Sequence, residues 1–285
     1  MIKPCDFDLA RWKEYPDLLT ESLWILGARS KDSAHVGDYW GNFVPQIPRQ
    51  ILRRFTSPGD WIVDLFSGMG TTLIECRILG RNGIGVDLNE DVVRASRERL
   101  GAAGNPGAAC IEILQGDATH PDTVGLVREV LARGNRTDAD CVFLHPPYHN
   151  IIRFSRDRRD LSNARGEGRF LEAFQRSVTH ATSLVRPGGH VVLVIGDIFR
   201  RGQVRPLGFL CMEMCRRSGL ELRAINVKDI QNTRGKGHRT NLWRYRAFKE
   251  GLYVFRHEYV MLFRRPLTGE EVKPPPSLVP DPGSP

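Results

Sequence analysis

The segment His145-Pro146-Pro147-Tyr148 combines residue types that suit a planar ring bearing an amino group. Proline has no N–H, so the backbone carbonyls of this segment project without local donors. A neutral His145 adds a side-chain acceptor, and Tyr148 adds an aromatic plane for stacking. A Pro-Pro loop with a packed tyrosine is the simpler alternative. The segment directly follows a predicted central strand, at the sheet edge where ligands bind, and this position favours the chemical interpretation.

A glycine-containing turn at residues 64–72 indicates a second binding element. Gly68 and Gly70 permit a sharp turn and a close approach of a ligand, and the helix that follows presents free N–H groups. Asp87 ends the next predicted strand, where an acid can accept both hydroxyls of a ribose. Asp117 follows the third strand. Each acid alone could be a helix cap or a turn residue, but acids after three successive strands suit an adenosine ligand.

The glycine spacing alone fits both nicotinamide cofactors and S-adenosylmethionine. Leu73 stands where the dinucleotide pattern Gly-x-Gly-x-x-Gly has its third glycine. Asp64 also precedes the glycines, where it can meet a cationic or amino-bearing group such as the methionine end of a cofactor. We therefore predict S-adenosylmethionine.

The predicted elements alternate along the chain. Strands are predicted at residues 61–66, 83–87, 111–114, 141–144, 190–195, 221–227 and 259–263. Helices are predicted at residues 71–79, 89–100, 122–132, 169–185 and 206–217. This alternation predicts an α/β fold with a doubly wound, mostly parallel, seven-stranded sheet. No helix is predicted between the last two strands, which we expect to form an antiparallel pair at one edge.

Three segments are expected on this basis. Residues 1–38 form an N-terminal helical extension, with the helical pattern centred on residues 10–26. Residues 39–265 form the main domain, with a basic insert at about 228–256. Residues 266–285 are rich in proline, which disfavours helix and sheet, so we expect a disordered tail.

The charge of the chain favours an anionic partner. The net charge is +8, from 41 basic and 33 acidic residues. Two basic segments flank the predicted site, and one of them also carries aromatic side chains, as in nucleic-acid contacts. The candidate contacts are Arg153, Arg156, Arg234, Lys236, Arg239, Trp243, Arg244 and Arg246.

Other classes of protein are disfavoured. No run of 18 apolar residues is present and the N-terminus lacks an apolar leader, so we expect a cytoplasmic protein without a membrane span. The six cysteines have no zinc-site spacing, so no metal is expected.

These motifs together resemble the amino-methylating DNA methyltransferases. Residues 64–72 are similar to the family's Asp-Pro-Phe-x-Gly-x-Gly-Thr-Thr motif, with Leu65 in the proline place. Residues 145–148 are similar to the motif (Asp/Asn/Ser)-Pro-Pro-(Tyr/Phe/Trp). Residues 42–48 look like the segment that closes over the methionine end of the cofactor, and residues 257–264 look like the last strand.

The resemblance implies a Rossmann-like methyltransferase fold and S-adenosylmethionine as cofactor. It implies double-stranded DNA as partner, bound in the nucleoid, and a cognate restriction enzyme. The oligomeric state stays open. The implied catalytic residues are His145, Pro146, Pro147 and Tyr148. The implied cofactor-binding residues are Phe43, Val44, Pro45, Asp64, Phe66, Gly68, Gly70, Thr71, Thr72, Asp87, Leu88 and Asp117.

His145 departs from the family motif, which begins with Asp, Asn or Ser. A non-acidic residue here favours N4 of cytosine, with N6 of adenine as the alternative. Because a protonated imidazole cannot accept a hydrogen bond, we expect activity to fall at acidic pH. The departure also leaves open an inactive DNA-binding module, and the same motif occurs in RNA and protein-amide methyltransferases. A carbon-5 cytosine enzyme is disfavoured because Pro4-Cys5 is the only Pro-Cys pair and lies far from these motifs.

Overall fold

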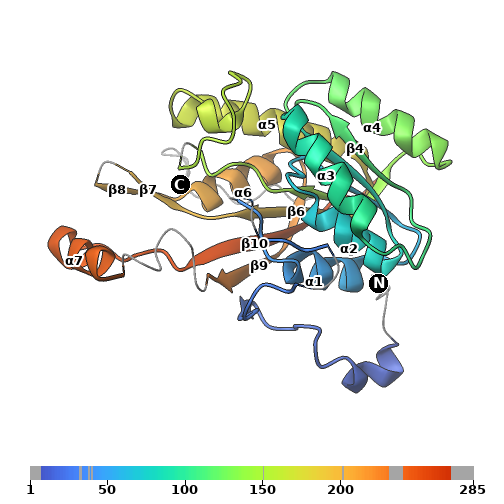
Figure 1. Cartoon of the computed structure of the whole chain (residues 1–285), viewed down its shortest axis with the longest axis horizontal. Helices are drawn as coiled ribbons and strands as arrows, with labels where there is room; N and C mark the ends of the chain where they lie inside the picture. The colour runs from blue at the N-terminus through green and yellow to red at the C-terminus, as the bar shows by residue number, and fades with distance from the viewer. Residues whose placement is uncertain are drawn as a thin grey trace, which may run out of the picture.

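The computed structural model describes residues 8–31, 34–37, 39, 41–149, 151–200, 202–230 and 240–270. Its centre is an eight-stranded sheet with helices on both faces (Figure 1). The strand order is β1-β9-β10-β6-β5-β2-β3-β4, and a separate hairpin pairs β7 with β8. The predicted doubly wound, mostly parallel α/β fold is therefore confirmed. The count is eight because a two-residue strand, β1, joins the seven that the sequence predicts.

Five parallel strands form the half of the sheet that was predicted from apolar runs. They are β2 (Trp61–Asp64), β3 (Asn82–Asp87), β4 (Ile111–Gln115), β5 (Ala139–Leu144) and β6 (Val185–Ile195). Every residue of β2 and β5 is buried, as expected for central strands covered on both faces.

The other half of the sheet, as far as the structure describes it, includes the one strand of this sheet that runs antiparallel to its neighbours. It consists of β1 (Leu23–Trp24), β9 (Glu221–Asp229) and β10 (His257–Arg264). β10 runs antiparallel to both β6 and β9, while β1 pairs with β9 in parallel. The predicted antiparallel pairing of the last two strands is thus present, with β1 outside it.

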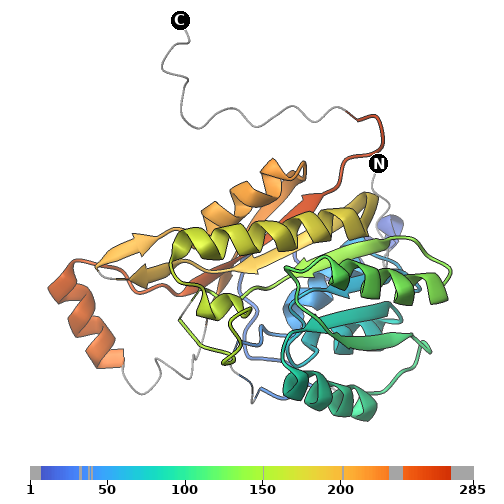
Figure 2. The same ribbon diagram turned by 90° about the horizontal axis from the view of Figure 1, so that it is seen from above.

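The helices form two layers, one on each face of the sheet. One face of the sheet carries α4 (Asp122–Arg133), α5 (Glu167–Leu184) and α6 (Leu207–Arg217). The other carries α1 (Gln46–Phe55), α2 (Thr71–Leu79) and α3 (Glu90–Ala102). Figure 2 looks from above onto the layer that contains α5 and α6. Buried side chains pack between each layer and the sheet, including Phe170 and Phe174 of α5 and Ile47 and Ile51 of α1.

Several expectations about local structure are wrong. Residues 10–26 are not one helix: a 3-10 helix at Leu9–Glu14 precedes β1. Helix α1 was not predicted, nor was the hairpin of β7 (Ile198–Arg200) and β8 (Gln203–Arg205). A further helix, α7 (Thr240–Glu250), lies between β9 and β10 and projects from the body at the left of Figure 1.

Two further expectations concern the ends and the membrane. Most of the predicted tail, residues 271–285, lies outside the described residues, and residues 266–270 form no helix or strand. None of the helices within the described ranges is long and apolar enough to cross a membrane.

Candidate active site

A cavity of about 400 Å³ opens at the carboxyl ends of the parallel strands. The loops after β2, β3, β4 and β5 form one side of it, and β9 and β10 contribute to the other. Most of the predicted catalytic and cofactor-binding residues line this cavity. They are Phe43, Val44, Asp64, Phe66, Gly68, Thr71, Asp87, Leu88, Asp117, His145, Pro146, Pro147 and Tyr148.

Three predicted cofactor-binding residues do not line the cavity. Pro45 immediately precedes α1 and sets its start. Thr72 is fully buried and donates its hydroxyl to Asp64 at 2.6 Å. Gly70 precedes α2 in the left-handed conformation, with φ of 78°. Each therefore shapes the site from behind and does not face a ligand.

Two glycines shape the turn between β2 and α2. Gly68 and Gly70 both have positive φ, a backbone conformation that side chains disfavour. A Cβ on Gly70 would lie 2.6 Å from the Ser96 hydroxyl oxygen of α3, so α3 can pack closely against this turn only if the residue is glycine.

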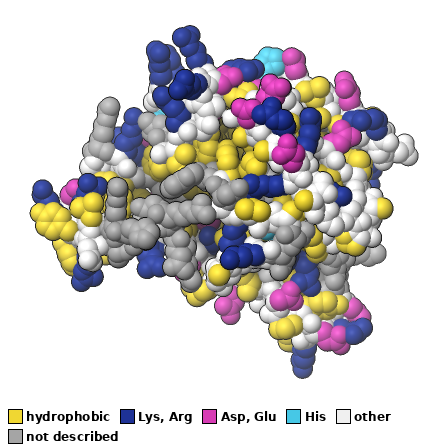
Figure 3. Space-filling view, viewed as in Figure 1, with side chains coloured by type: hydrophobic (Ala, Val, Ile, Leu, Met, Phe, Trp, Pro, Cys, Tyr) yellow, Lys and Arg dark blue, Asp and Glu magenta, His cyan; other side chains and the backbone are white. Residues whose placement is uncertain are grey.

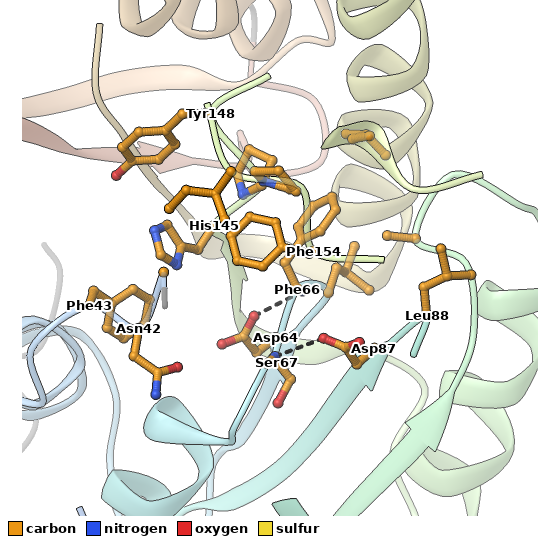
Figure 4. A pocket seen from close by; sticks show the side chains of 18 of the residues that line it. Asn42, Phe43, Asp64, Phe66, Ser67, Asp87, Leu88, His145, Tyr148 and Phe154 are labelled. Atoms are coloured by element: carbon orange, nitrogen blue, oxygen red, sulfur yellow. Dashed lines mark hydrogen bonds between the residues drawn. The ribbon is translucent and has the colours of Figure 1, made fainter. Parts of the chain in front are cut away.

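Two carboxylates, the buried Asp64 and the partly buried Asp87, are held at the ends of neighbouring strands. Asp64 accepts hydrogen bonds from the Phe66 N–H and the Thr72 hydroxyl, and Asp87 accepts from the N–H groups of Gly68 and Asn89. Burial raises the pKa of both Asp64 and Asp87 to about 6. Figure 4 shows the two acids next to each other at one end of the pocket. A polar or cationic ligand would replace the hydration that these carboxylates have lost.

Two polar side chains at this end have unused hydrogen-bonding atoms. Among the described atoms, the Asn42 amide nitrogen and the Ser67 hydroxyl oxygen are buried without a partner, and both residues line the cavity. Buried polar atoms are nearly always bonded, so these two indicate a polar ligand or water in this part of the pocket.

The four-residue segment after β5 forms the other end of the pocket. The His145 ring lies between those of Phe43 and Tyr148, with centroid distances of 4.8 and 5.8 Å (Figure 4). Burial lowers the pKa of His145 to about 4, with a further lowering from Lys228 that is opposed by Glu258. The imidazole is therefore neutral, and an acceptor, far below neutral pH.

Lys228 and Glu258 also line this end, although neither was predicted from the sequence as a site residue. They lie opposite each other on β9 and β10, and their charged groups are 3.0 Å apart. The Tyr148 hydroxyl donates to Glu258 at 2.8 Å. Only the strand register, which the sequence did not give, could have revealed this group.

The predicted DNA contacts are spread over two surface segments. Arg153 and Arg156 are exposed on the loop after the four-residue segment. On α7, Arg244 stacks on Phe248 and Arg246 stacks on Trp243, and Figure 3 shows basic and hydrophobic side chains mixed there. Arg234, Lys236 and Arg239 lie outside the described residues.

Gly196 and Asp197 directly follow β6 and do not line the cavity. Asp197 instead accepts from the Gly208 N–H at the start of α6 and from the Tyr259 hydroxyl. Gly196 lies behind the pocket, where a Cβ would come within 3.1 Å of the Tyr148 ring. This glycine thus leaves the space that Tyr148 occupies.

Comparisons with solved structures give matches of low sequence identity. TrmN from Thermus thermophilus is 19% identical, with a TM-score of 0.47, over 78% of this chain and 49% of that protein. The [4+2]-cyclase SpnF is 14% identical, with a TM-score of 0.48, over 90% of this chain and 95% of that protein.

Sequence comparisons are more specific, and each covers about a third of the chain. The type II methyltransferase M.MjaII of Methanocaldococcus jannaschii is 39% identical over 84 residues, which are 30% of this chain and 14% of that protein. M2.DpnII of Streptococcus pneumoniae is 38% identical over 94 residues, 32% of each chain. These matches span well under two thirds of either relative. Residues 11–98 match the N6/N4 methyltransferase family, described as DNA methylase, which confirms the resemblance to the amino-methylating DNA methyltransferases.

Proposed function

We propose that this protein transfers a methyl group from S-adenosylmethionine to an exocyclic amino group of a base in double-stranded DNA. N4 of cytosine is the favoured target, and N6 of adenine is the alternative. One observation carries the proposal: the acids of three successive strand ends and the segment 145–148 line a single cavity. The family match over residues 11–98 supports the same chemistry.

The residues at the acidic end fit the proposed cofactor. Asp87 has free acceptor capacity for a ribose, and Asp117 lies beside it on the cavity wall. Asn42 and Ser67 offer buried, unpartnered polar atoms to the methionine end, near the carboxylate of Asp64. When bound, S-adenosylmethionine would supply an electrophilic methyl group on a positively charged sulfur.

The other end of the cavity suits the amino group that receives the methyl. An exocyclic amine is a weak nucleophile because its lone pair is delocalised into the ring. Acceptors at His145 and at the Pro146 carbonyl would hold its two N–H bonds and orient the lone pair toward the methyl carbon. Positioning of this kind can supply much of a rate enhancement. Tyr148 would stack on the base, which has to leave the duplex to reach the cavity.

His145 would orient the amino group without taking its proton. Since burial lowers the pKa of His145 to about 4, the imidazole is a weak base at neutral pH. A freshly methylated amino group is strongly acidic, so water can take the released proton. The same low pKa revises the expectation from sequence. His145 should remain a hydrogen-bond acceptor at pH 5, so its protonation should not lower the activity at that pH.

The proposed DNA contacts lie near the mouth of the cavity and on the arm, the segment between β9 and β10 that carries α7. Arg244 and Arg246 of α7, with Arg153 and Arg156, would contact phosphates or base edges. A DNA substrate would place the protein in the cytoplasm, and a cognate restriction enzyme would be its functional partner.

Sequencing of DNA from cells that express the protein, by a method that reports modified bases, tests the proposal. We expect one methylated motif, absent from cells that express His145→Leu. Purified protein with labelled cofactor should label duplex DNA and not RNA. Binding of cofactor and DNA without transfer would instead support an inactive DNA-binding module.

A further inference from the structure

Tyr148, Glu258 and Lys228 form a connected polar group at the base end of the cavity. The Tyr148 hydroxyl donates to one Glu258 carboxylate oxygen at 2.8 Å, and the Lys228 ammonium lies 3.0 Å from the other. The side chains of Lys228 and Glu258 are 8% and 10% exposed. All three residues nevertheless line the cavity, so their remaining exposure is toward its interior.

The position of this ion pair indicates a role in binding. A buried ion pair contributes little net stability, because the loss of hydration offsets the attraction of the charges. Here the pair faces a cavity, so a ligand can use the hydrogen-bonding capacity that remains. An ammonium has three N–H donors, and Glu258 is the one partner that the described residues provide, so two donors of Lys228 are left.

The two candidate bases differ in what they offer to these donors. Next to its amino group, cytosine presents two acceptors in succession, the ring nitrogen N3 and the keto oxygen O2. Adenine presents the acceptor N1 and then a C–H, which cannot accept. Lys228 and His145 line the same cavity, and the chain of contacts from Lys228 through Glu258 to Tyr148 ends at a ring whose centroid is 5.8 Å from that of His145. A base whose amino group is held at His145 would therefore lie within reach of the ammonium.

We propose that Lys228 is the residue that selects cytosine over adenine, through hydrogen bonds to N3 and O2. Glu258 holds the ammonium in place and compensates its charge, and it ties this contact to the stacking residue Tyr148. With adenine, one buried N–H of Lys228 would face a C–H group, and an unpaired buried donor costs about 1–3 kcal/mol, or ~5- to 150-fold in rate. This inference rests on the proposed function.

The test uses duplexes that contain the target motif found by sequencing. The target base is cytosine, 2-thiocytosine, whose sulfur is a weak acceptor, or adenine. The enzymes are the wild type, the single variant Lys228→Met, and the double variant Lys228→Met/Glu258→Gln. In the double variant, the amide introduced at position 258 avoids an unpaired buried carboxylate, and its oxygen still accepts from Tyr148. Lys13→Met, on the exposed helix Leu9–Glu14, is the control. Thermal unfolding and cofactor binding show whether each variant is folded.

We expect the wild type and Lys13→Met to lose about tenfold in kcat/KM on 2-thiocytosine and more on adenine. The double variant should have a lower kcat/KM on cytosine, an equal kcat/KM on cytosine and 2-thiocytosine, and a smaller preference for cytosine over adenine. An equal loss of kcat/KM on 2-thiocytosine in the wild type and the double variant would overturn the role of Lys228. A wild type whose target motif is methylated at adenine would overturn it as well. If the wild type methylates no duplex at all, the proposed function fails, and this inference fails with it.

Discussion

The two ends of the cavity are constructed differently. At the acidic end, residues 64–72 and Asp87 come from neighbouring parallel strands, and their hydrogen bonds join positions at most 19 residues apart. At the base end, Tyr148 meets Glu258 across 110 positions, and Lys228 enters through the register of β9 and β10. Local motifs can therefore specify the acidic end, whereas the base end depends on how distant strands align. This difference predicts that each end can be impaired without the other.

The largest effect is expected at His145. His145→Leu removes the side-chain acceptor and should lower the single-turnover methyl-transfer rate by about 10²- to 10³-fold. His145→Asn, which restores an acceptor, should recover much of that loss. Calorimetric titration should give an unchanged cofactor affinity for both variants. A His145→Leu enzyme that transfers at the wild-type rate would show that the backbone acceptors suffice.

Asp87→Ala should impair the other end. Loss of a carboxylate that accepts from two ribose hydroxyls should weaken cofactor binding by about 10²-fold, because hydrogen bonds to charged groups contribute ~1.5–3 kcal/mol each. At saturating cofactor, the transfer rate should stay within a few-fold of the wild type. Asp91→Ala, on the exposed first turn of α3, is the matched control. A lower saturated rate with normal affinity would contradict the separation of the two ends.

The two ends should also respond differently to pH. Burial raises the pKa of Asp64 and Asp87 to about 6, and a ligand that requires their ionised forms loses affinity as they gain protons below that pH. We expect cofactor affinity to fall by about tenfold per pH unit below 6 for each acid that must ionise. At saturating cofactor, the transfer rate should stay flat to about pH 5, because the pKa of His145 is about 4. A fall in the saturated rate near pH 6 would instead indicate a base-end group that titrates there.

The smallest effect is expected on α7, outside both ends. Arg244→Ala/Arg246→Ala should weaken DNA binding by several-fold and reduce the slope of log K against log salt by about 2, with chemistry at saturating DNA unchanged. Arg94→Ala, exposed on α3, should change neither. Filter binding at several salt concentrations measures both quantities. An unchanged slope would exclude phosphate contacts by these two arginines.

The parallel half of the fold was largely predictable. Helix α2 begins and ends where the sequence predicts, because Gly70 and Gly80 mark its ends. The predicted strands 61–66 and 141–144 correspond to β2 and β5, whose continuous burial leaves a clear apolar run. Asp64, Asp87 and Asp117 could be placed at one sheet edge because they lie at or after the ends of β2, β3 and β4, which run parallel.

The remaining features lack such local signals. Helix α1 lacks a clear signal because its first residues resemble the family segment that closes over the cofactor, and because it contains Pro48, which is tolerated only in the first turn of a helix. Helix α7 has no apolar face, so no periodic pattern marks it. Lys228 and Glu258 belong to a basic segment and a strand that look ordinary until β9 and β10 are aligned.

The arm that carries α7 leaves and returns at the wall of the cavity. The Ile230 N–H donates to the Arg256 carbonyl at 2.8 Å, so the ladder of β9 and β10 closes just beyond Lys228 and Glu258. The free-energy cost of closing a loop grows slowly, by about 0.6 kcal/mol for each doubling of its length. An arm of different length or sequence could therefore be grafted between these two positions while the residues at its base keep their register. If α7 contacts DNA as we propose, such an exchange would change that contact and leave the residues of the cavity in place.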